Sequence, residues 1–357
     1  MSKKLFIPGP VTVREDVLQA MATQQIGHRS KDASELQKRI SDKMRKVMFT
    51  ENLIVLSTTS GSGLMESAIR SCTAKRAAVF SVGAFGDRWY KMAVANGVPA
   101  DKFSSTPGQP TTPEMVEEAL ATGKYDLVTV THNETSSGLQ NPVKAIGEVV
   151  KKYPDVVFCV DTVSSMGGAK IEVDAWGIDV CITSTQKCLG LPAGMSIASV
   201  STKAYERAKT VTNRGLYLDL VELYEFVVKK DQYPSTPSLS HMFALDYQLT
   251  QIVDVEGVEN RIKRHSEMAN VVRGWATKYF SVFPLAGYES NTLSVVNNTR
   301  GIDVSALNKE LGKRGFEIAN GYGDNKDITF RIAHMADASI QDVNDLLSNI
   351  NDILGLE

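Results

Sequence analysis

Short apolar runs alternate with stretches of helical spacing along much of the first two hundred residues. The apolar runs lie at 53–56, 77–82, 126–131, 156–160, 180–182 and 194–200. Strands that alternate with helices predict an α/β fold with a mainly parallel central sheet covered by helices on both faces. The central runs show no polar alternation, which is typical of strands buried on both sides.

The pattern changes after residue 210. A loop with a short helix is predicted for 211–237, and helical spacing then runs from 240 to 278 with a break near Gly257. Strand and helix patterns alternate again at 292–296, 304–314, 328–332 and 340–354. A chain of 357 residues is long enough for a large domain and a smaller one. We therefore expect an N-terminal arm at 1–14, a large domain at 15–255 and a small α+β C-terminal domain at 256–357.

Charge and hydropathy argue against several classes of partner. The formal net charge is −2 and no block of like charge stands out, so neither nucleic acid nor a membrane is expected as a partner. No apolar run approaches the ~18 residues of a membrane span, and the start shows no signal-peptide pattern. The four cysteines have no CxxC spacing. We expect reduced core cysteines, no metal site and a cytoplasmic location.

Two charged residues follow apolar runs that are successive along the chain. Asp161 follows the run 156–160, and Lys187 comes shortly after the run 180–182. A buried carboxylate needs a positive partner, and burial of a lysine lowers its pKa and suits it to imine chemistry. The pair points to an electron-sink cofactor held through a Schiff base, with the acid opposite a pyridine nitrogen. The alternatives are a helix N-cap for Asp161 and a solvated surface lysine.

Three other strand ends carry polar, glycine-rich loops at 57–63, 82–89 and 131–138. The first offers backbone N–H groups and hydroxyls to an anion at a helix N-terminus, although it is neither a P-loop nor a G-x-G-x-x-G fingerprint. In the second, Phe85 is a candidate to stack on a planar ring. In the third, Thr135 is a candidate contact for a phenolic oxygen, with His132 or Asn133 near the cleft. Taken singly, each loop also has a plain structural explanation. The first would be a turn, the second a helix start whose aromatic residue points into the core, and the third a polar loop with capping hydroxyls. Ligands of open parallel sheets bind outside the carboxyl ends of the strands, so together the loops predict one site.

Three further segments carry candidate contacts. Arg331 lies in the predicted strand 328–332, where its guanidinium would suit a substrate carboxylate, although an arginine at a strand edge is more often a surface residue. The cluster 27–31 is either a helix cap or an anion contact. The segment 233–237 offers a tyrosine and a threonine hydroxyl on a rigid loop, or is a proline-rich connector.

With these residues in place, the chain resembles the class V aminotransferases of fold type I, which use pyridoxal 5'-phosphate. It is most similar to the alanine–glyoxylate and serine–pyruvate branch. The resemblance covers essentially the whole chain, and its most specific element is Ser184-Thr-Gln-Lys187 together with Asp161. The supporting elements lie at 8–10, 60–62, 83–88, 131–138, 217–219 and 330–332.

The resemblance implies a role for each candidate residue. Lys187 would form the aldimine with the cofactor, and Asp161 would pair with the pyridine nitrogen. Phe85 would stack on the ring, where many relatives carry tryptophan, and Thr135 would contact its 3-oxygen. The remaining cofactor contacts would come from Ser60, Gly61, Ser62, Val163 and Gln186, and from Tyr233 and Thr236 of a partner subunit. The substrate would be bound by Arg331, Gly9, His28 and Arg29.

The implied enzyme is a homodimeric transaminase, since a site shared between chains requires a dimer. It would move the amino group of a small amino acid, alanine or serine, to a 2-oxo acid such as glyoxylate or pyruvate. Gln186 stands where cysteine desulfurases carry histidine, and no catalytic cysteine loop is recognisable in the tail, so sulfur transfer is not expected. Cys188 has no assigned role.

Three alternatives stand beside this prediction. The segment His28-Arg29-Ser-Lys31 resembles the one that helps to bind the substrate phosphate in phosphoserine aminotransferases. A nicotinamide-dependent oxidoreductase with a doubly wound sheet would need the G-x-G-x-x-G fingerprint after its first strand, which is missing. A non-catalytic binding module would not need to retain Lys187, Asp161 and Arg331 together.

Overall fold

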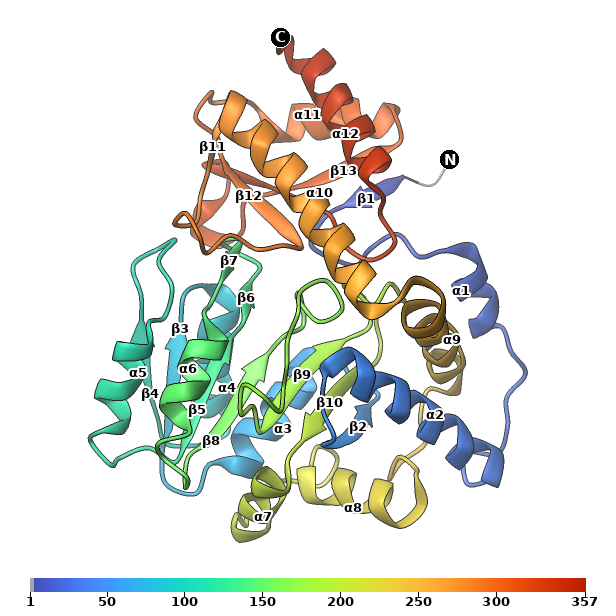
Figure 1. The fold of residues 1–357 in the computed structure, drawn as a ribbon, viewed down its shortest axis with the longest axis vertical. Helices are drawn as coiled ribbons and strands as arrows, with labels where there is room; N and C mark the ends of the chain where they lie inside the picture. Colours follow the sequence, from blue (N-terminus) through green and yellow to red (C-terminus); the bar gives the residue numbers. More distant parts are fainter. Residues whose placement is uncertain (1–2) are drawn as a thin grey trace.

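The computed structural model describes residues 3–357, so the first two residues of the predicted arm lie outside it. Its larger sheet has seven strands in the order β2-β10-β9-β8-β5-β3-β4 (Figure 1). Every neighbouring pair is parallel except the two made by β10, which runs antiparallel to both β2 and β9. The strands are β2 (Leu53–Ser57), β3 (Ala77–Ser81), β4 (Ala100–Ser104), β5 (Leu127–Thr131), β8 (Val157–Asp161), β9 (Val180–Ser184) and β10 (Ser196–Val200).

Helices cover both faces of this sheet, as predicted. In β5, Val128 and Val130 pack into one apolar cluster while Leu127 packs into the other. The first cluster contains residues of α1 (Glu15–Met21), α2 (Lys31–Met48), α5 (Pro113–Leu120), α6 (Val143–Val150) and α9 (Leu239–Thr250). The second contains residues of α3 (Gly61–Cys72), α4 (Ala84–Ala95), α7 (Thr202–Thr210) and α8 (Leu220–Lys230). Four buried, unpaired cysteines lie among these elements.

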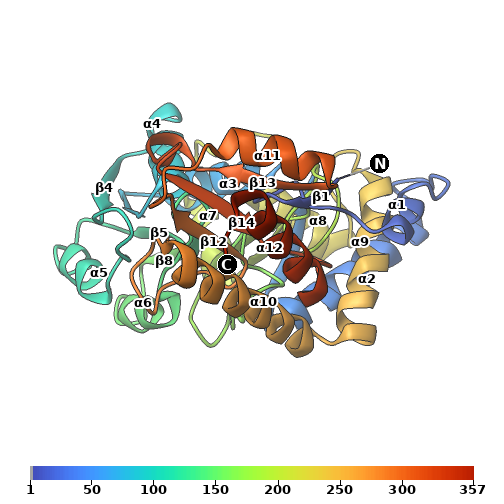
Figure 2. The same ribbon diagram turned by 90° about the horizontal axis from the view of Figure 1, so that it is seen from above.

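A smaller unit lies above the larger one in Figure 1. Its five-stranded sheet has the order β1-β13-β14-β12-β11. Helices α10 (Val258–Tyr279), α11 (Val304–Lys313) and α12 (Ile340–Leu354) gather around these strands in the view from above (Figure 2). The strands are β1 (Lys4–Phe6), β11 (Ser281–Val282), β12 (Leu293–Asn297), β13 (Phe316–Asn320) and β14 (Thr329–Ala333).

Several strands depart from the sequence-based expectation, which lacked β11 and β13 among others. The predicted extended arm contains β1, which pairs in parallel with β13, and Phe6 is buried in the core of the smaller unit. The edge strand β4 was not predicted, because its partly exposed Ala-Asp-Lys-Phe-Ser sequence lacks an apolar run. Short polar edge strands of this kind protect a sheet from further pairing.

The long helical stretch is broken near Gly257, as predicted. Helix α9 continues into a π-helical turn, η1 (Gln251–Glu256), and Gly257 adopts a φ of 81° before α10 begins. A positive φ favours glycine at this position. We propose that the boundary between the large and small domains lies here, at residues 255–256. Within residues 3–357, no helix is both long and apolar enough to cross a membrane.

Candidate active site

Asp161 and Lys187 meet at the carboxyl edge of the large sheet. Asp161 is the last residue of β8 and pairs in register with Thr131 of β5, while Lys187 lies just beyond the end of β9. Both are buried, with exposed fractions of 4% and 8%. The alternative of a solvated surface lysine is therefore wrong. The backbone N–H of Val163 donates to Asp161 Oδ1 at 2.8 Å. This contact resembles the N-cap that the sequence offered as the alternative role of Asp161.

Burial moves the pKa values of both groups closer to neutral pH. Desolvation raises the pKa of Asp161 to about 6, against the lowering effect of the Val163 N–H. Desolvation lowers the pKa of Lys187 to about 8, and the positive charge of Arg331 contributes to the lowering. Opposed shifts of an acid and a base in one cleft are typical of a catalytic site.

The N-terminal arm passes directly over Lys187. Lys187 Nζ donates a hydrogen bond to the carbonyl oxygen of Pro8. The Val11 N–H donates to the carbonyl of Gln186 at 3.3 Å. A Cβ on Gly9 would stand 2.7 Å from Lys187 Cδ, and Gly9 has a φ of 84°. Only glycine permits so close an approach in this conformation.

The turn between β2 and α3 lies against the loop that follows Asp161. A Cβ on Gly61 would stand 2.5 Å from Val163 Cγ2 and 3.6 Å from Ser184 Oγ. Ser60 is the N-cap residue of α3, yet its side chain makes no capping hydrogen bond. Ser184 Oγ and Gln186 Oε1 are buried without a hydrogen-bond partner among the described residues. Buried polar atoms normally have partners. The Ser184 hydroxyl can donate to an anionic group placed at the start of α3, whereas the Gln186 oxygen is an acceptor and needs a donor.

Phe85 lies in the first turn of α4, with the guanidinium carbon of Arg88 4.8 Å from the centre of its ring. Arg88 also donates to Ser62 Oγ at 3.0 Å, which joins this helix to the start of α3. The sequence did not identify Arg88 as a site residue, because the single arginine on an amphipathic helix resembles an ordinary surface residue.

Glu134 was also missed by the sequence-based reasoning. It is fully buried in the loop after β5, where its carboxylate accepts hydrogen bonds from the backbone N–H groups of Phe85, Gly86 and Ser136 and from Ser136 Oγ. Burial raises the pKa of Glu134, while these donors lower it. Each of these hydrogen-bond partners is a donor, which a carboxylate oxygen can accept from. The sequence feature that could have identified Glu134 is its carboxylate within the Asn-Glu-Thr-Ser loop.

Thr135 belongs to a buried hydrogen-bond network that reaches the smaller unit. Its hydroxyl donates to Ser164 Oγ at 2.9 Å, and Ser164 Oγ donates to the carbonyl of Asn133 at 2.9 Å. Thr292, which directly precedes β12 in the smaller unit, donates to the Ser164 carbonyl at 2.6 Å. The network fixes the loop after β5 against the loop after β8, and both loops against the segment before β12.

Arg331 reaches the site from β14. Its Nε donates to the carbonyl of Asn320 at 2.8 Å, and its guanidinium carbon lies 5.4 Å from the centre of the Tyr322 ring. Arg331 is half-buried, and desolvation lowers its pKa. Because Arg331 is half-buried and its charge contributes to the lowered pKa of Lys187, it is not a plain surface residue.

Four of the predicted site residues come from the segments 28–29 and 233–236, apart from the strand ends that carry Asp161 and Lys187. Arg29 donates to the carbonyl oxygens of Tyr233, at 2.6 Å, and Pro234. Tyr233 is buried within its own chain near Ser57, and desolvation raises its pKa to about 12. Thr236 is exposed and His28 is half-buried. Among residues 3–357, no hydrogen bond or ion pair joins these four side chains to Lys187.

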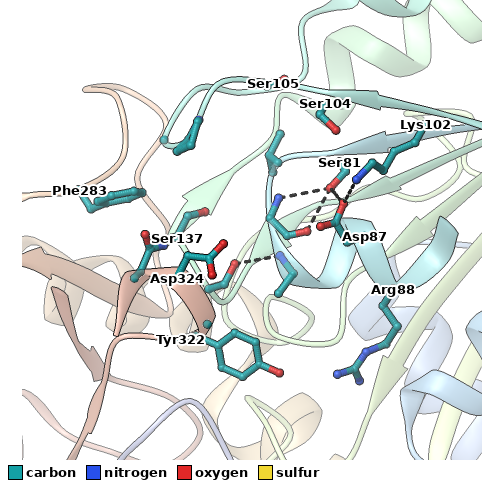
Figure 3. Close-up of a pocket in the computed structure, with 18 of the residues that line it drawn as sticks. Ser81, Asp87, Arg88, Lys102, Ser104, Ser105, Ser137, Phe283, Tyr322 and Asp324 are labelled. Carbon is teal, nitrogen blue, oxygen red and sulfur yellow. Dashed lines mark hydrogen bonds and ion pairs between the residues drawn. The ribbon is translucent and has the colours of Figure 1, made fainter. Parts of the chain in front are cut away.

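A cavity of about 480 Å³ opens beside the Phe85 turn. Its lining residues come from both units and include Gly83, Arg88 and Ser136 of the larger unit and Tyr322 and Asp324 of the smaller one. Figure 3 shows Tyr322 and Arg88 at one end of the cavity, while Asp87 contacts Ser81 and Lys102 at the other. The cavity therefore lies between the two units, and its lining does not include Asp161, Lys187 or Arg331.

This architecture defines a class of enzymes. A doubly covered sheet with a buried lysine at its carboxyl edge, capped by a second smaller sheet, is the fold type I architecture of pyridoxal-phosphate enzymes. The model of the aminotransferase class-V family matches residues 14–323. The chain therefore belongs to the class V aminotransferases and is a transaminase, and the predicted family and fold class are confirmed.

Individual relatives agree with this assignment. The chain is 39% identical over 343 residues to an uncharacterized aminotransferase of Methanocaldococcus jannaschii, with 94% of this chain and 88% of the relative covered. It is 31% identical to a serine–glyoxylate aminotransferase of Methylorubrum extorquens, with 93% and 86% covered. The crystal structure of an alanine–glyoxylate aminotransferase from Nostoc sp. is 28% identical, covers 99% and 96% of the two chains and superposes with a TM-score of 0.93. Family membership excludes the nicotinamide-dependent alternative.

Proposed function

We propose that this transaminase uses pyridoxal 5'-phosphate to move the amino group of alanine or serine to a 2-oxo acid, glyoxylate or pyruvate. The observation that carries the proposal is the buried Lys187, held beneath Pro8 with Asp161 at the adjacent strand end. The names of the relatives, which include serine–glyoxylate and alanine–glyoxylate aminotransferases, support these substrates.

The donor groups of the site fit this cofactor. When bound, pyridoxal phosphate supplies an electron sink for the substrate's α-carbon. The unpartnered Ser184 hydroxyl and the free N–H groups at the start of α3 suit its phosphate. Gln186 would donate to the phosphate through the NH₂ group of its side chain. We assign phosphate contacts to Ser60, Gly61, Ser62 and Gln186, with Val163 closing the space beside them. Phe85 would lie against the ring, and Thr135 would face its 3-oxygen.

Asp161 would hold the cofactor's ring nitrogen in its protonated form. The carboxylate is buried and accepts a hydrogen bond from Val163, and no cationic side chain of residues 3–357 is bonded to it. A buried carboxylate is strongly stabilised by an adjacent positive charge. With a pKa of about 6 even without that partner, Asp161 is mostly ionised at neutral pH.

Lys187 would act as the general base and acid of the proton transfer. Its pKa of about 8 leaves a useful fraction of neutral amine near physiological pH. A base with a pKa close to the working pH is best suited to take a proton from the α-carbon and to return it. Burial beneath the Pro8–Gly9 arm keeps bulk water from competing for that proton.

Arg331 would bind the substrate carboxylate. Asn320 occupies its Nε, which leaves the Nη edge of the guanidinium for a ligand. A planar guanidinium edge matches the two oxygens of a carboxylate. Gly9 would lie over the bound substrate, and His28 and Arg29 are proposed as outer substrate contacts.

A homodimer would complete the site. The loop 232–237 carries the exposed Thr236, and nearby Leu216 and Tyr217 are 84% and 50% exposed. Exposed apolar side chains of this size mark an association surface. We propose that Tyr233 and Thr236 contact the cofactor of the partner subunit, and that the dimer functions in the cytoplasm. Sedimentation of the Leu216→Asp variant is expected to show monomers, and a dimeric variant would contradict this surface.

The experiment that tests the function is a half-reaction panel. Holoenzyme is mixed with alanine, serine, phosphoserine or aspartate, and the change in cofactor absorbance is followed. Alanine and serine are expected to react fastest, and Lys187→Ala is expected to lose both turnover and the visible band of the bound cofactor. A preference for phosphoserine that Arg29→Ala removes would instead favour phosphoserine transamination. A Lys187→Ala variant that still transaminates would overturn the assignment.

A further inference from the structure

Arg331 is held by two contacts from one short segment that precedes its strand. The carbonyl of Asn320 accepts from Nε at 2.8 Å, and the Tyr322 ring lies 5.4 Å from the guanidinium carbon. The two contacts restrain the guanidinium from different directions. A side chain with the rotamer freedom of arginine is thereby reduced to a narrow set of orientations.

Tyr322 also reaches across to the larger unit. The centres of the Tyr322 and Phe85 rings are 5.9 Å apart and the ring planes are inclined by 34°. This distance is within the range of attractive aromatic pairs. Tyr322 therefore connects the carboxylate-binding arginine of the smaller unit with the ring that we assign to cofactor stacking.

Tyr322 also lines the cavity between the two units. Tyr322 is 38% exposed and lines the 480 Å³ cavity together with Arg88, as Figure 3 shows. The Arg331 guanidinium lies over a face of the Tyr322 ring. A cation is attracted to an aromatic face, and the attraction is stronger when the pair is desolvated.

We propose that Tyr322 is a positioning residue for substrate binding, which holds the Arg331 guanidinium with its Nη edge directed at the α-carboxylate. The role rests on the proposed function of Arg331 as the carboxylate clamp. Tyr322 makes no contact with the reacting atoms in this arrangement; it acts through Arg331. Its effect should appear in substrate affinity and not in the chemical step.

The structure provides a clean set of variants. Tyr322→Phe keeps the aromatic face, whereas Tyr322→Leu keeps apolar bulk but removes it. Because the residue is partly exposed in a surface segment, neither change empties a core position. Ile328→Ala is a matched control, since Ile328 is 59% exposed in the segment that leads into the same strand.

The probe is L-lactate, which carries the carboxylate of alanine without its amino group. Its dissociation constant from the holoenzyme is measured by calorimetry. Tyr322→Leu is expected to weaken binding about three- to tenfold, while Tyr322→Phe and Ile328→Ala bind as the wild type does. In turnover, the KM for alanine should rise by a similar factor in Tyr322→Leu while kcat changes less than about twofold.

The possible outcomes distinguish a failure of the positioning role of Tyr322 from a failure of the proposed role of Arg331. Lactate binding that Arg331→Met leaves unchanged would overturn the carboxylate clamp itself, and with it the role of Tyr322. Binding that depends on Arg331 but is the same in Tyr322→Leu as in the wild type would overturn only the positioning role. An equal loss in Tyr322→Phe and Tyr322→Leu would also overturn it, because the aromatic face would then be irrelevant.

Discussion

The carboxylate of Glu134 accepts a hydrogen bond from the backbone N–H of Phe85 at 3.1 Å. Helix α4 begins after Gly83, which has no side chain to cap the free N–H groups of the first turn. Glu134 supplies that cap from a different strand end, and a Cβ on Gly83 would stand 2.7 Å from its carboxyl carbon. The backbone position of Phe85 is therefore set by the loop that also carries Thr135.

Glu134→Gln should weaken cofactor binding without abolishing the fold. The substitution replaces one acceptor oxygen by an NH₂ group that faces N–H donors, and hydrogen bonds to a charged acceptor contribute about 1.5–3 kcal/mol each. We expect the dissociation constant of pyridoxal phosphate to rise about tenfold or more, measured by titrating the apoenzyme and following its absorbance. Glu148→Gln, at an exposed carboxylate, serves as the control. Unchanged affinity in Glu134→Gln would show that Phe85 does not depend on this cap.

Asp161→Asn should stabilise the apoenzyme while it impairs the holoenzyme. The pKa of Asp161 is raised in the folded state, from 3.8 to about 6. The favourable contribution of its neutral form is complete below about pH 4 and is lost as the pH rises through about 6. An asparagine stays neutral, so the apoenzyme variant should gain up to about 3 kcal/mol at pH 7, at 1.36 kcal/mol per pKa unit.

Denaturant unfolding of the apoenzyme between pH 4 and pH 8 tests this expectation. The wild type should lose stability between about pH 4 and pH 6 relative to Asp161→Asn, and addition of pyridoxal phosphate should stabilise the wild type more than the variant. Asp345→Asn, at an exposed position of α12, should leave both curves unchanged. If Asp161→Asn destabilises the apoenzyme at pH 7, the carboxylate already has a stabilising partner.

Gly61 and Val163 form a pair that a double substitution can test. Since a Cβ at Gly61 would stand 2.5 Å from Val163 Cγ2, Gly61→Ala should displace the loop after Asp161 or the start of α3, and overpacking of this kind costs about 1–3 kcal/mol. We expect weaker pyridoxal phosphate binding in Gly61→Ala and partial recovery in Gly61→Ala/Val163→Ala. Gly274→Ala is the control, because its Cβ would meet nothing within 4 Å. A double variant as weak as Gly61→Ala would show that the clash is not the cause.

The position of Asp161 and Lys187 was predictable because the sequence marks where strands end. Parallel strands bring their carboxyl ends to one edge, so polar residues after buried runs converge without any knowledge of long-range contacts. Phe85 and Thr135 come to this edge by the same rule, and the apolar runs before Asp161 and Lys187 correspond to β8 and β9. Arg331 also reaches the site, although its strand belongs to the other sheet.

Contacts between distant segments were not predictable from local pattern. The pairing of β1 with β13, the antiparallel course of β10 and the contact of Tyr322 with Phe85 depend on how the two units fit together. Glu134 resembles any polar loop residue until its donors are known, and the same holds for Ser164. Local sequence thus marks the side chains at the strand ends, whereas the residues that orient them are found only in the folded chain.

The last prediction concerns Arg261, which links the segment after Lys187 to Glu256 at the domain junction and to Asp337 of the smaller unit. It is 1% exposed and donates to the carbonyl of Cys188 at 2.7 Å, while its guanidinium forms ion pairs with Glu256 and Asp337 at 2.7 and 2.9 Å. Arg261→Met leaves two carboxylates without this partner and frees the Cys188 carbonyl. Removal of one member of a buried ion pair costs about 3–5 kcal/mol.

Thermal and denaturant unfolding of Arg261→Met should show a loss of that size, and the variant's cofactor band should shift because Lys187 is no longer fixed through its neighbour. Arg261→Met/Asp337→Asn should recover part of the loss, since a neutral amide needs no cation. Arg300→Met, at an exposed arginine of the smaller unit, should change neither quantity. If Arg261→Met is as stable as the wild type, the ion pairs contribute nothing net to folding. If it is destabilised with an unchanged cofactor band, the network supports the fold but does not position Lys187.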